Sequence, residues 1–527
     1  MSLVSKFASV GSATLASRFL GFFREAMIAS ILGAGPVADA FYAAFRFPNL
    51  FRRLFAEGAF NSAFVPLFAK ELEGGGREAA RKFGEQVLSV LICVLLVLTA
   101  LAMIFMPLLV RTVIAARFDP ASETFEITVV LGRIMFPYLA AMSLVAMLSG
   151  ILNSFRRYFL AALAPVLLNV FLIAVLLVAL QSGAEPRTTG LLLAWGVAIS
   201  GLAQLLLLIW GVRRGGFSLS LKPPALTKPV KRLLWLAIPA AITGGITQIN
   251  LLVGQNIASA EQGAIAILNY GDRLMQLPLG VIGIAIGVVL LPELSRALKA
   301  GDHADARHLQ NRSLEFGLGL TLPAAIGFIL MPEPLVALVY ERGLFTRETT
   351  QVTAQVLAAF SAGLPAFVMI AIFRPGFYAR EDMKTPMWFA GANAVVNILL
   401  SVMLFPVYGV VGIGIATAIA GWVNALLLAG AQWRGNLFRP SQETGRRLAL
   451  ILLANCIMAA VVWLAMIQFG ATMMDGSLLL RIAATLAVVL AAAAIYFAII
   501  IATGAVERSQ LAGMFRRRRD PPDTSQL

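Results

Sequence analysis

The chain has 527 residues, of which 59% are hydrophobic and only 13% are charged, whereas soluble domains carry about 25% charged residues. This composition excludes an ordinary soluble globular protein and indicates a protein of the lipid bilayer, where roughly 20 apolar residues span the hydrocarbon core. The net charge of +15 does not indicate nucleic-acid binding, because most Lys and Arg residues lie in short segments between apolar runs.

Apolar runs in chain order predict fourteen membrane helices. The first run continues past Gly21 without a small-residue cleavage site, so we expect a retained helix and not a signal peptide. The uncharged stretch 385–433 is too long for one span, and the segment 405–409 divides it in two. The predicted helices are 6–31, 37–69, 87–110, 127–153, 159–182, 189–212, 232–258, 264–299, 306–331, 350–378, 385–405, 409–433, 446–470 and 479–503.

The distribution of Lys and Arg predicts the orientation of these helices. An even number of helices puts both termini on one side, and 28 of the 42 Lys and Arg residues lie in segments on that side. The loops on the opposite side carry six, all of them arginines. Because cytoplasmic loops carry the excess of positive charge, we expect a multi-pass membrane protein with both termini in the cytoplasm.

Short sequence matches predict an internal repeat of six helices. The segment 64–70 resembles 290–296, and Pro137 and Asn169 are spaced like Pro365 and Asn397, at offsets of 226 and 228 residues. Six helices per repeat give both halves the same orientation, with a symmetry axis along the membrane normal. The predicted parts are an N-lobe at 1–215, a C-lobe at 216–435, two additional helices within 436–505, and a basic cytoplasmic tail at 506–527.

The second predicted helix is unusual because it places charged residues within an aromatic, apolar segment. Asp39, Arg46 and Arg53 follow one another at intervals of seven residues and share one helical face. Glu57 lies four residues after Arg53, within reach of an ion pair. We expect this helix to turn its charges away from lipid. The remaining polar residues of the charged stripe are Asn49 and Arg52.

Eight arginines and no lysine lie within predicted helices. An arginine at the centre of a membrane helix costs about 2.5–3.5 kcal/mol even on the mildest scale, so it normally faces a cavity or a partner. Only four acids lie at the same depth, which leaves an excess of positive charge, and the planar fork of arginine suits phosphate. We therefore expect an anionic ligand. The arginines are Arg18, Arg24, Arg46, Arg52, Arg53, Arg133, Arg273 and Arg374, and the acids are Glu25, Asp39, Glu57 and Asp272.

Several of these arginines have a structural alternative. Arg24 with Glu25 or Asp39 would form an internal salt bridge, as would Arg273 with Asp272. Arginines near helix ends would instead reach the membrane interface, and for Arg133 and Arg374 a structural role is favoured. The candidate binding residues are Arg18, Arg24, Asn49, Arg52, Arg53 and Arg273, and the supporting charge network is Glu25, Asp39, Arg46, Glu57 and Asp272.

The sequence contains no enzyme signature. His303 and His308 are the only histidines, five residues apart in a predicted basic loop, and no metal-binding or phosphate-binding motif occurs. Cys93 and Cys456 lie in long apolar runs and predict no disulfide. We expect no catalytic residues, no metal site and no cofactor, and the sequence leaves a coupling ion or use of the membrane potential open.

Several motifs closely resemble the MurJ (MviN) family of lipid II flippases, and the resemblance spans the whole chain. The most specific block lies in the second predicted helix, and further matches occur in both predicted repeats. The matching segments are Ser17-Arg18, Gly33-Ala34-Gly35, Asp39-Ala40-Phe41, Pro48-Asn49-Leu50-Phe51-Arg52-Arg53, Phe55-Ala56-Glu57-Gly58, Ala63-Phe64-Val65-Pro66, Ala164-Pro165, Tyr270-Gly271-Asp272-Arg273, Pro375-Gly376-Phe377-Tyr378 and Lys384-Thr385-Pro386.

The resemblance implies the multidrug/oligosaccharidyl-lipid/polysaccharide exporter fold, with two six-helix lobes around a central cavity and a groove for a polyprenyl tail at the two additional helices. It implies a bacterial inner-membrane protein that moves lipid II to the periplasmic leaflet by alternating access, with membrane lipids and cell-wall synthesis proteins as partners. It also implies that Arg18, Arg24, Arg52, Arg53 and Arg273 line the cavity, beside Asp39 and Glu57. Gln276 stands where some members carry an acid, so an ion pair with Arg273 is not expected there.

Two other functions remain open at this point. A polysaccharide-lipid flippase of the same fold would also handle a polyprenyl diphosphate, but it would not require the second-helix block. A multidrug cation exporter would line its cavity with unpaired acids, which the excess of arginine does not favour.

Overall fold

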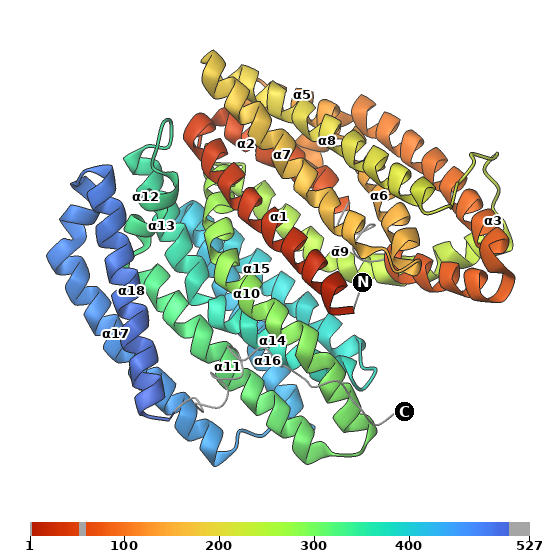
Figure 1. The fold of residues 1–527 in the computed structure, drawn as a ribbon. Helices are drawn as coiled ribbons and strands as arrows, with labels where there is room; N and C mark the ends of the chain where they lie inside the picture. The colour runs from red at the N-terminus through yellow and green to blue at the C-terminus, as the bar shows by residue number, and fades with distance from the viewer. Residues whose placement is uncertain (1–2, 52–59, 505–527) are drawn as a thin grey trace. The chain divides into compact units, whose positions relative to one another are not determined.

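The computed structural model describes residues 3–51 and 60–504, and every regular element in these residues is a helix (Figure 1). Helices satisfy each backbone N–H and C=O internally, which the bilayer core demands. The helices are α1 (Leu3–Leu32), α2 (Pro36–Phe51), α3 (Phe60–Ile104), α4 (Met106–Leu109), the π-helix η2 (Val110–Ile114), α5 (Glu123–Met135), α6 (Pro137–Ser154), α7 (Tyr158–Ser182), α8 (Pro186–Arg214), α9 (Lys228–Ala258), α10 (Ala264–Lys299), α11 (His303–Leu330), α12 (Pro332–Tyr340), α13 (Arg347–Ala362), α14 (Leu364–Tyr378), α15 (Lys384–Tyr408), α16 (Val410–Arg434), α17 (Gln442–Asp475) and α18 (Leu478–Ala502).

The helices follow the predicted apolar runs in order. Within the described residues, ten helical segments are long and apolar enough to cross a membrane, and they coincide with the third to sixth and ninth to fourteenth predicted runs. The other four runs are occupied by α1, by α2 with the start of α3, by α9 and by α10. The predicted all-helical membrane fold is therefore confirmed and is consistent with fourteen spans, although the number fourteen itself stays a prediction.

Two of the predicted helices are interrupted at prolines. The fourth consists of α5 and α6, which meet at Phe136 before Pro137, and the tenth consists of α13 and α14, which meet at Gly363 before Pro365. A proline lacks the backbone N–H that would continue the preceding helix, but it fits the first turn of a new one. The two breaks lie at matching positions of the two predicted repeats.

The predicted loop between the second and third membrane helices is helical instead. The helix α3 runs from Phe60 to Ile104 and is interrupted only at Gly76, whose φ of 70° lies in the left-handed region that favours glycine. The residues around this break are rich in Glu, Lys, Arg, Ala and Gln, which are strong helix formers. Their charge is expected to keep these residues outside the bilayer, but it does not prevent them from forming a helix. The nine-residue helix α12 lies outside the predicted runs, the π-helix η2 begins at the last residue of the predicted helix 87–110, and α4 falls within that predicted helix.

Packing divides the chain into two compact units. Unit 1 comprises Met1–Arg273, Val339–Val356 and Ala390–Ala416. Within it α7 packs between α1 and α8, α2 packs against α5, and α3 packs against α6, as Figure 1 shows for α1 and α7. Buried Phe64 and Phe68 on α3 begin an aromatic cluster with Phe83, Phe155 and Phe217.

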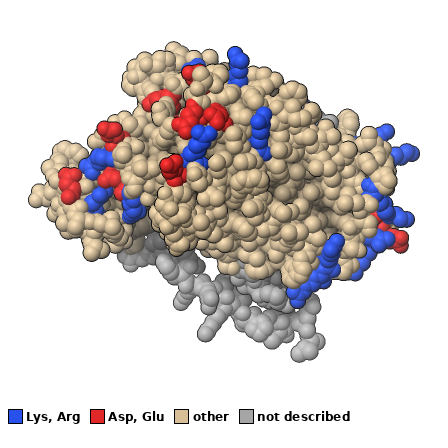
Figure 2. Space-filling view, turned by 90° about the horizontal axis from the view of Figure 1, so that it is seen from above, with Lys and Arg blue, Asp and Glu red and all other residues tan. Residues whose placement is uncertain are grey.

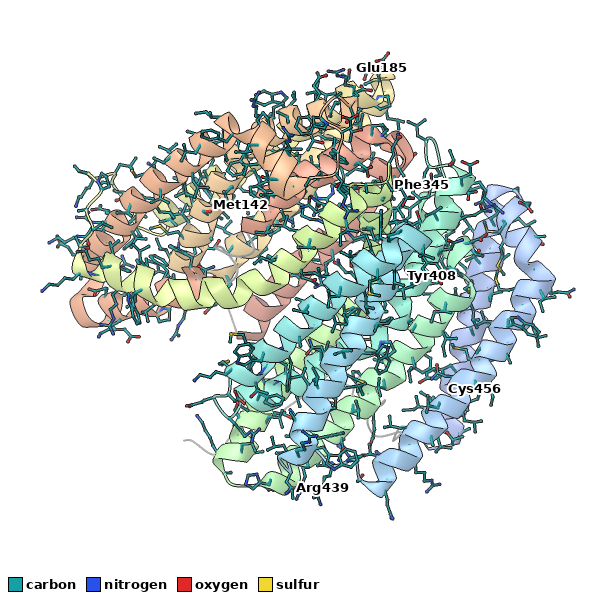
Figure 3. The ribbon with its side chains drawn as sticks, turned by 180° about the vertical axis from the view of Figure 1, so that it is seen from behind. Met142, Glu185, Phe345, Tyr408, Arg439 and Cys456 are labelled. Atoms are coloured by element: carbon teal, nitrogen blue, oxygen red, sulfur yellow. The ribbon has the colours of Figure 1, made fainter. Side chains whose placement is uncertain are left out.

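Unit 2 comprises Leu274–Leu338, Leu357–Phe389 and Thr417–Leu527. Within it α11 packs against α14 and α17, and α17 pairs along its length with α18 (Figure 1). The Arg447 guanidinium on α17 bonds the partly buried Glu315 carboxylate on α11 at 3.1 Å, which joins α17 to α11. Figure 3 labels Arg439, in the connection before α17, and Cys456, partway along α17.

Many large apolar side chains are exposed on the surface of the helices, as is expected of a protein that contacts lipid. Leu479 of α18, Trp235 of α9 and Phe19 of α1 are each at least three-quarters exposed, because water does not surround these helices in a bilayer. Figure 2 shows a face on which most of the surface belongs to neither acidic nor basic residues. An apolar surface of this kind is expected to contact lipid.

Candidate functional site

The predicted site residues that the structure describes lie on three helices of unit 1. Arg18, Arg24 and Glu25 are on α1, and Asp272 and Arg273 are on α10. Asp39, Arg46 and Asn49 are on α2, whereas Arg52, Arg53 and Glu57 lie outside the described residues.

The centre of the site is the carboxylate of Glu25, which is only 2% exposed. Its Oε1 atom is bonded by the guanidinium of Arg24 and lies 3.3 Å from Nη2 of Arg273. Its Oε2 atom accepts hydrogen bonds from the Tyr42 hydroxyl at 2.6 Å and from the Asn269 amide at 3.3 Å. A buried carboxylate is stable only when its charge is paired and its oxygens are hydrogen-bonded. The four donors come from α1, α2 and α10, so both predicted repeats build one cluster.

Arg24 is held on its other side by Asn169 of α7. Nη1 of Arg24 donates to Oδ1 of Asn169 at 2.9 Å, and the Asn169 amide donates to the Ser17 carbonyl at 2.9 Å. Gly21 lies beside this amide, and a Cβ there would make an ordinary van der Waals contact with Oδ1 of Asn169 at 3.5 Å. The Nε atom of Arg24 is buried and has no hydrogen-bond partner among the described residues. Arg24 is therefore rigidly oriented and keeps one donor for a further group.

Arg273 differs from Arg24 in its access to solvent. Its side chain is 35% exposed, whereas that of Arg24 is 8% exposed. Both guanidiniums share one carboxylate oxygen, and a guanidinium has five donors, so Arg273 retains the capacity to bind an anion. The Arg273 guanidinium donates to the Glu25 carboxylate, 248 residues away in the chain, at 3.3 Å.

Asp39 is one of the two predicted ion-pair partners of Arg24, but its carboxylate binds backbone N–H groups of another helix. Its carboxylate is fully buried and accepts hydrogen bonds from the backbone N–H groups of Gly263 at 2.5 Å and Ala266 at 2.9 Å. These groups belong to the N-terminus of α10, where unpaired N–H groups and the helix dipole favour a negative charge. Asp39 thus joins α2 to α10, and of the two acids considered for Arg24 the structure selects Glu25.

A layer of tyrosines closes the site at the same end of α10. The Tyr270 hydroxyl donates to the Gly33 carbonyl at 2.7 Å, and the Tyr340 hydroxyl donates to the Tyr270 carbonyl at 3.3 Å. Phe345, labelled in Figure 3, packs on the rings of both tyrosines. All four residues lie in unit 1, and three come from the second predicted repeat.

The connection between α12 and α13 approaches α1 very closely. The Leu344 N–H donates to the Ser30 carbonyl at 2.8 Å. Gly343 and Gly33 both have positive φ, and a Cβ on Gly343 would lie 2.2 Å from the Ser30 oxygen. Only glycine allows both the backbone conformation and the contact.

The remaining predicted residues lie apart from the Glu25 cluster or at its margin. Arg18 is exposed on α1. Arg46, Asn49 and Asp272 are half-buried, and each has an interaction partner. Three cluster members were not predicted as site residues: Asn169, Tyr42 and Asn269. Asn169 was recognised only as a marker of the repeat, and a buried asparagine within an apolar run is the signal that indicates a polar partner.

Within the described residues no group of three His, Cys, Asp or Glu side chains could hold a metal ion. Cys93 and Cys456 are free and exposed.

Within the described residues, the all-helical bundle with ten segments long and apolar enough to cross a membrane defines a multi-pass membrane protein. A multidrug resistance MATE family transporter of the MOP superfamily, in an inward-facing conformation, matches with a TM-score of 0.68 at 16% identity over 81% of this chain and 98% of that chain. This likeness shows the fold alone. A solved structure named "Lipid II flippase MurJ, inward closed conformation" matches with a TM-score of 0.77 at 27% identity, over 93% of this chain and 99% of that chain.

Sequence relatives narrow the class to one family. A Rhizobium meliloti protein named "Probable lipid II flippase MurJ" is 52% identical over 98% of this chain and 97% of its own length. The "Lipid II flippase MurJ" of Burkholderia cenocepacia is 35% identical over 96% of this chain and 98% of its own length. The family model described as "Lipid II flippase MurJ" matches residues 28–484. The chain belongs to the MurJ lipid II flippase family and is a multi-pass protein of the bacterial inner membrane.

Proposed function

We propose that this protein is a flippase that moves lipid II from the cytoplasmic to the periplasmic leaflet by alternating access. Family membership supports this function, and the observation that carries it is the pairing of Arg24 and Arg273 on one buried carboxylate. Lipid II carries a diphosphate, and arginine forks bind phosphate oxygens in pairs. The diphosphate would compete with Glu25 for guanidinium groups that come from both predicted repeats.

The other proposed ligands of the diphosphate are Arg18, Asn49, Arg52 and Arg53. Arg18 lies two turns before Glu25 on α1, and Asn49 lies near the end of α2. Arg46, Asp39, Glu57 and Asp272 would balance the charge of the cavity. The apolar tail would lie against α17 and α18, whose outward residues are large and exposed.

Alternating access is proposed to use the predicted division into an N-lobe at 1–215 and a C-lobe at 216–435, with α17 and α18 outside the repeat. Two contacts within unit 1 support this division, because each of them joins the two predicted repeats. They are the hydrogen bond from the Gly263 N–H to Asp39 and the hydrogen bond from the Leu344 N–H to the Ser30 carbonyl. If these contacts close the periplasmic side, they must separate during each cycle. Both termini are proposed to be cytoplasmic, from the distribution of Lys and Arg.

The membrane potential is expected to assist flipping. Moving one negative charge outward across an inside-negative membrane is favourable by about 2.3 kcal/mol per 100 mV. Collapse of the potential at a fixed pH gradient should therefore slow the appearance of lipid II in the periplasmic leaflet. An unchanged rate would mean that ion coupling or the consumption of lipid II drives the process.

The proposed function is tested by leaflet-resolved accessibility of lipid II in cells depleted of this protein. Lipid II should accumulate in the cytoplasmic leaflet and become inaccessible to a periplasmic reagent. Accessibility that remains normal after depletion would contradict the proposal. If a different polyprenyl-diphosphate saccharide accumulated in its place, the protein would be a polysaccharide-lipid flippase of the same fold.

A further inference from the structure

The connection between α8 and α9, residues 215–227, links the two predicted repeats and forms neither a helix nor a strand. It lies against α3 and makes a regular series of contacts there. The Ser220 N–H donates to Oε1 of Glu85 at 3.1 Å, and the Lys222 N–H donates to Oγ of Ser89 at 3.1 Å. The backbone of an exposed connection normally forms hydrogen bonds with water. Some feature of α3 therefore favours these contacts with the protein instead.

The explanation is the burial of Glu85. This residue is 1% exposed, although Ser220 and Lys222, which contact it, are exposed. The Lys222 ammonium lies 2.5 Å from Oε2 of Glu85, and Arg81 of the same helix lies 3.9 Å from Oε1. The connection therefore supplies both a cation and a backbone donor to a buried carboxylate. If the connection left, Glu85 would lose the Lys222 ammonium and the Ser220 N–H and would be hydrated instead, so the stability of the clamp is the difference between these contacts and hydration.

Apolar and polar contacts fix the two ends of the connection. At its start, the buried Phe217 ring lies 5.2 Å from the ring of Phe155 and 5.8 Å from that of Phe68. At its end, the Thr227 hydroxyl donates to Oε1 of Gln86 at 2.8 Å, one residue before α9 begins.

Small residues and prolines shape the path between these ends. A Cβ on Gly84 would lie 3.1 Å from Leu219, so glycine lets the connection approach α3. Pro223 and Pro224 restrict the backbone between the two sets of polar contacts. The segment is held at several points along its length and has little slack.

We propose that Glu85, Gln86 and Ser89 clamp the α8–α9 connection to α3 throughout the transport cycle. The two predicted repeats would then be joined at a fixed point, Thr227 on Gln86, and not by a loose tether. Any movement of one repeat against the other would be absorbed beyond Thr227. Glu85 would be a positioning residue that determines where α9 starts relative to α3.

Amide hydrogen exchange tests the clamp directly and does not depend on flipping. In the full-length protein, the amides of Ser220 and Lys222 should be protected, and Glu85→Ala should make them exchange about tenfold faster or more, because hydrogen bonds to charged groups are the strong ones. The matched control is Glu126→Ala, which removes an exposed acid paired with Arg187 and should not change exchange in the connection. Rapid exchange in the unmodified protein, or no effect of Glu85→Ala, would overturn the proposal.

A covalent lock tests whether the clamp persists during transport. Gln86→Cys and Thr227→Cys, in a chain carrying Cys93→Ala and Cys456→Ala, would be joined by a short bifunctional thiol reagent. The locked protein should flip fluorescent lipid II in vesicles at the rate of the unlocked double variant. Loss of flipping on locking, with recovery on cleavage of the reagent, would show that the connection must leave α3. If the unmodified protein did not flip lipid II, the proposed function would fail while the exchange result still decided the clamp.

Discussion

Replacing Arg24 with alanine is expected to abolish flipping while the protein still inserts into the membrane. Arg24 pairs with the buried Glu25 and is fixed by Asn169, and its buried Nε atom has no hydrogen-bond partner among the described residues. Arg273→Ala should have the same effect, because the second guanidinium on Glu25 is lost. Lysine at either position keeps the charge but loses the two-pronged hydrogen bonding, so it should restore flipping only in part. Growth support and protein abundance measured together would show this.

A double variant separates ligand binding from simple neutralisation of Glu25. Removing one partner of a buried ion pair destabilises a protein by about 3–5 kcal/mol, and removing both avoids that penalty. Arg24→Ala with Glu25→Ala should therefore be more stable than Arg24→Ala alone but should still fail to flip lipid II. Normal flipping in the double variant would mean that Arg24 serves only to compensate Glu25.

Matched controls exist elsewhere in the chain. Arg133 is also an arginine within a predicted membrane helix, but its guanidinium donates to the Met103 carbonyl and is exposed. Arg133→Ala should leave flipping unchanged. Arg52→Ala with Arg53→Ala extends the test to residues outside the described part of the chain, and flipping should again be lost. Normal flipping in that double variant would place the diphosphate elsewhere.

Joining α2 to α10 through cysteines at Ala40 and Ala266 is expected to stop flipping. The Asp39 carboxylate lies 2.9 Å from the Ala266 N–H, so the neighbouring backbone positions are close, and both alanines are fully buried. A disulfide needs Cα atoms about 4.4–6.8 Å apart, and a short bifunctional reagent covers a longer gap. Because α2 and α10 belong to different predicted repeats, the link should hold the site closed at this end. Flipping is measured in vesicles before and after cleavage of the link.

The control for this experiment is a link inside one predicted repeat. Glu126 of α5 and Arg187 of α8 contact each other at 2.8 Å and are both exposed, so cysteines there should tolerate linking without loss of flipping. Full-rate flipping by the protein linked between Ala40 and Ala266 would contradict movement of one repeat against the other.

Much of the fold follows from local patterns in the sequence. Each apolar run became a helix, and Pro137 and Pro365 ended one helix and began the next, because these effects act within a few residues. The scarcity of acids in the helices also predicted that arginines from both repeats would need a partner, and Arg24 and Arg273 meet on Glu25. The free-energy cost of placing an arginine within a membrane helix depends on that residue and its apolar neighbours in the sequence. It can therefore be recognised from the sequence alone.

The partners themselves could not be predicted in the same way. Arg273 contacts Glu25 across 248 residues, and Asp39 binds backbone groups 224 and 227 residues away. Backbone donors leave no mark in the sequence. Glu85 lies in a segment that was predicted to be a solvent-exposed loop because it is rich in charged residues. In the structure the α8–α9 connection covers Glu85 and buries it.

The central claim is tested most directly with the purified protein in lipid vesicles that contain fluorescent lipid II in both leaflets. A membrane-impermeant reagent that destroys the fluorophore reaches only the outer leaflet of protein-free vesicles. With the unmodified protein, the protected inner pool should be lost over time, whereas with Arg24→Ala, Glu25→Ala it should persist. Equal persistence of the inner pool with and without the unmodified protein, in vesicles shown to contain it folded, would contradict the account.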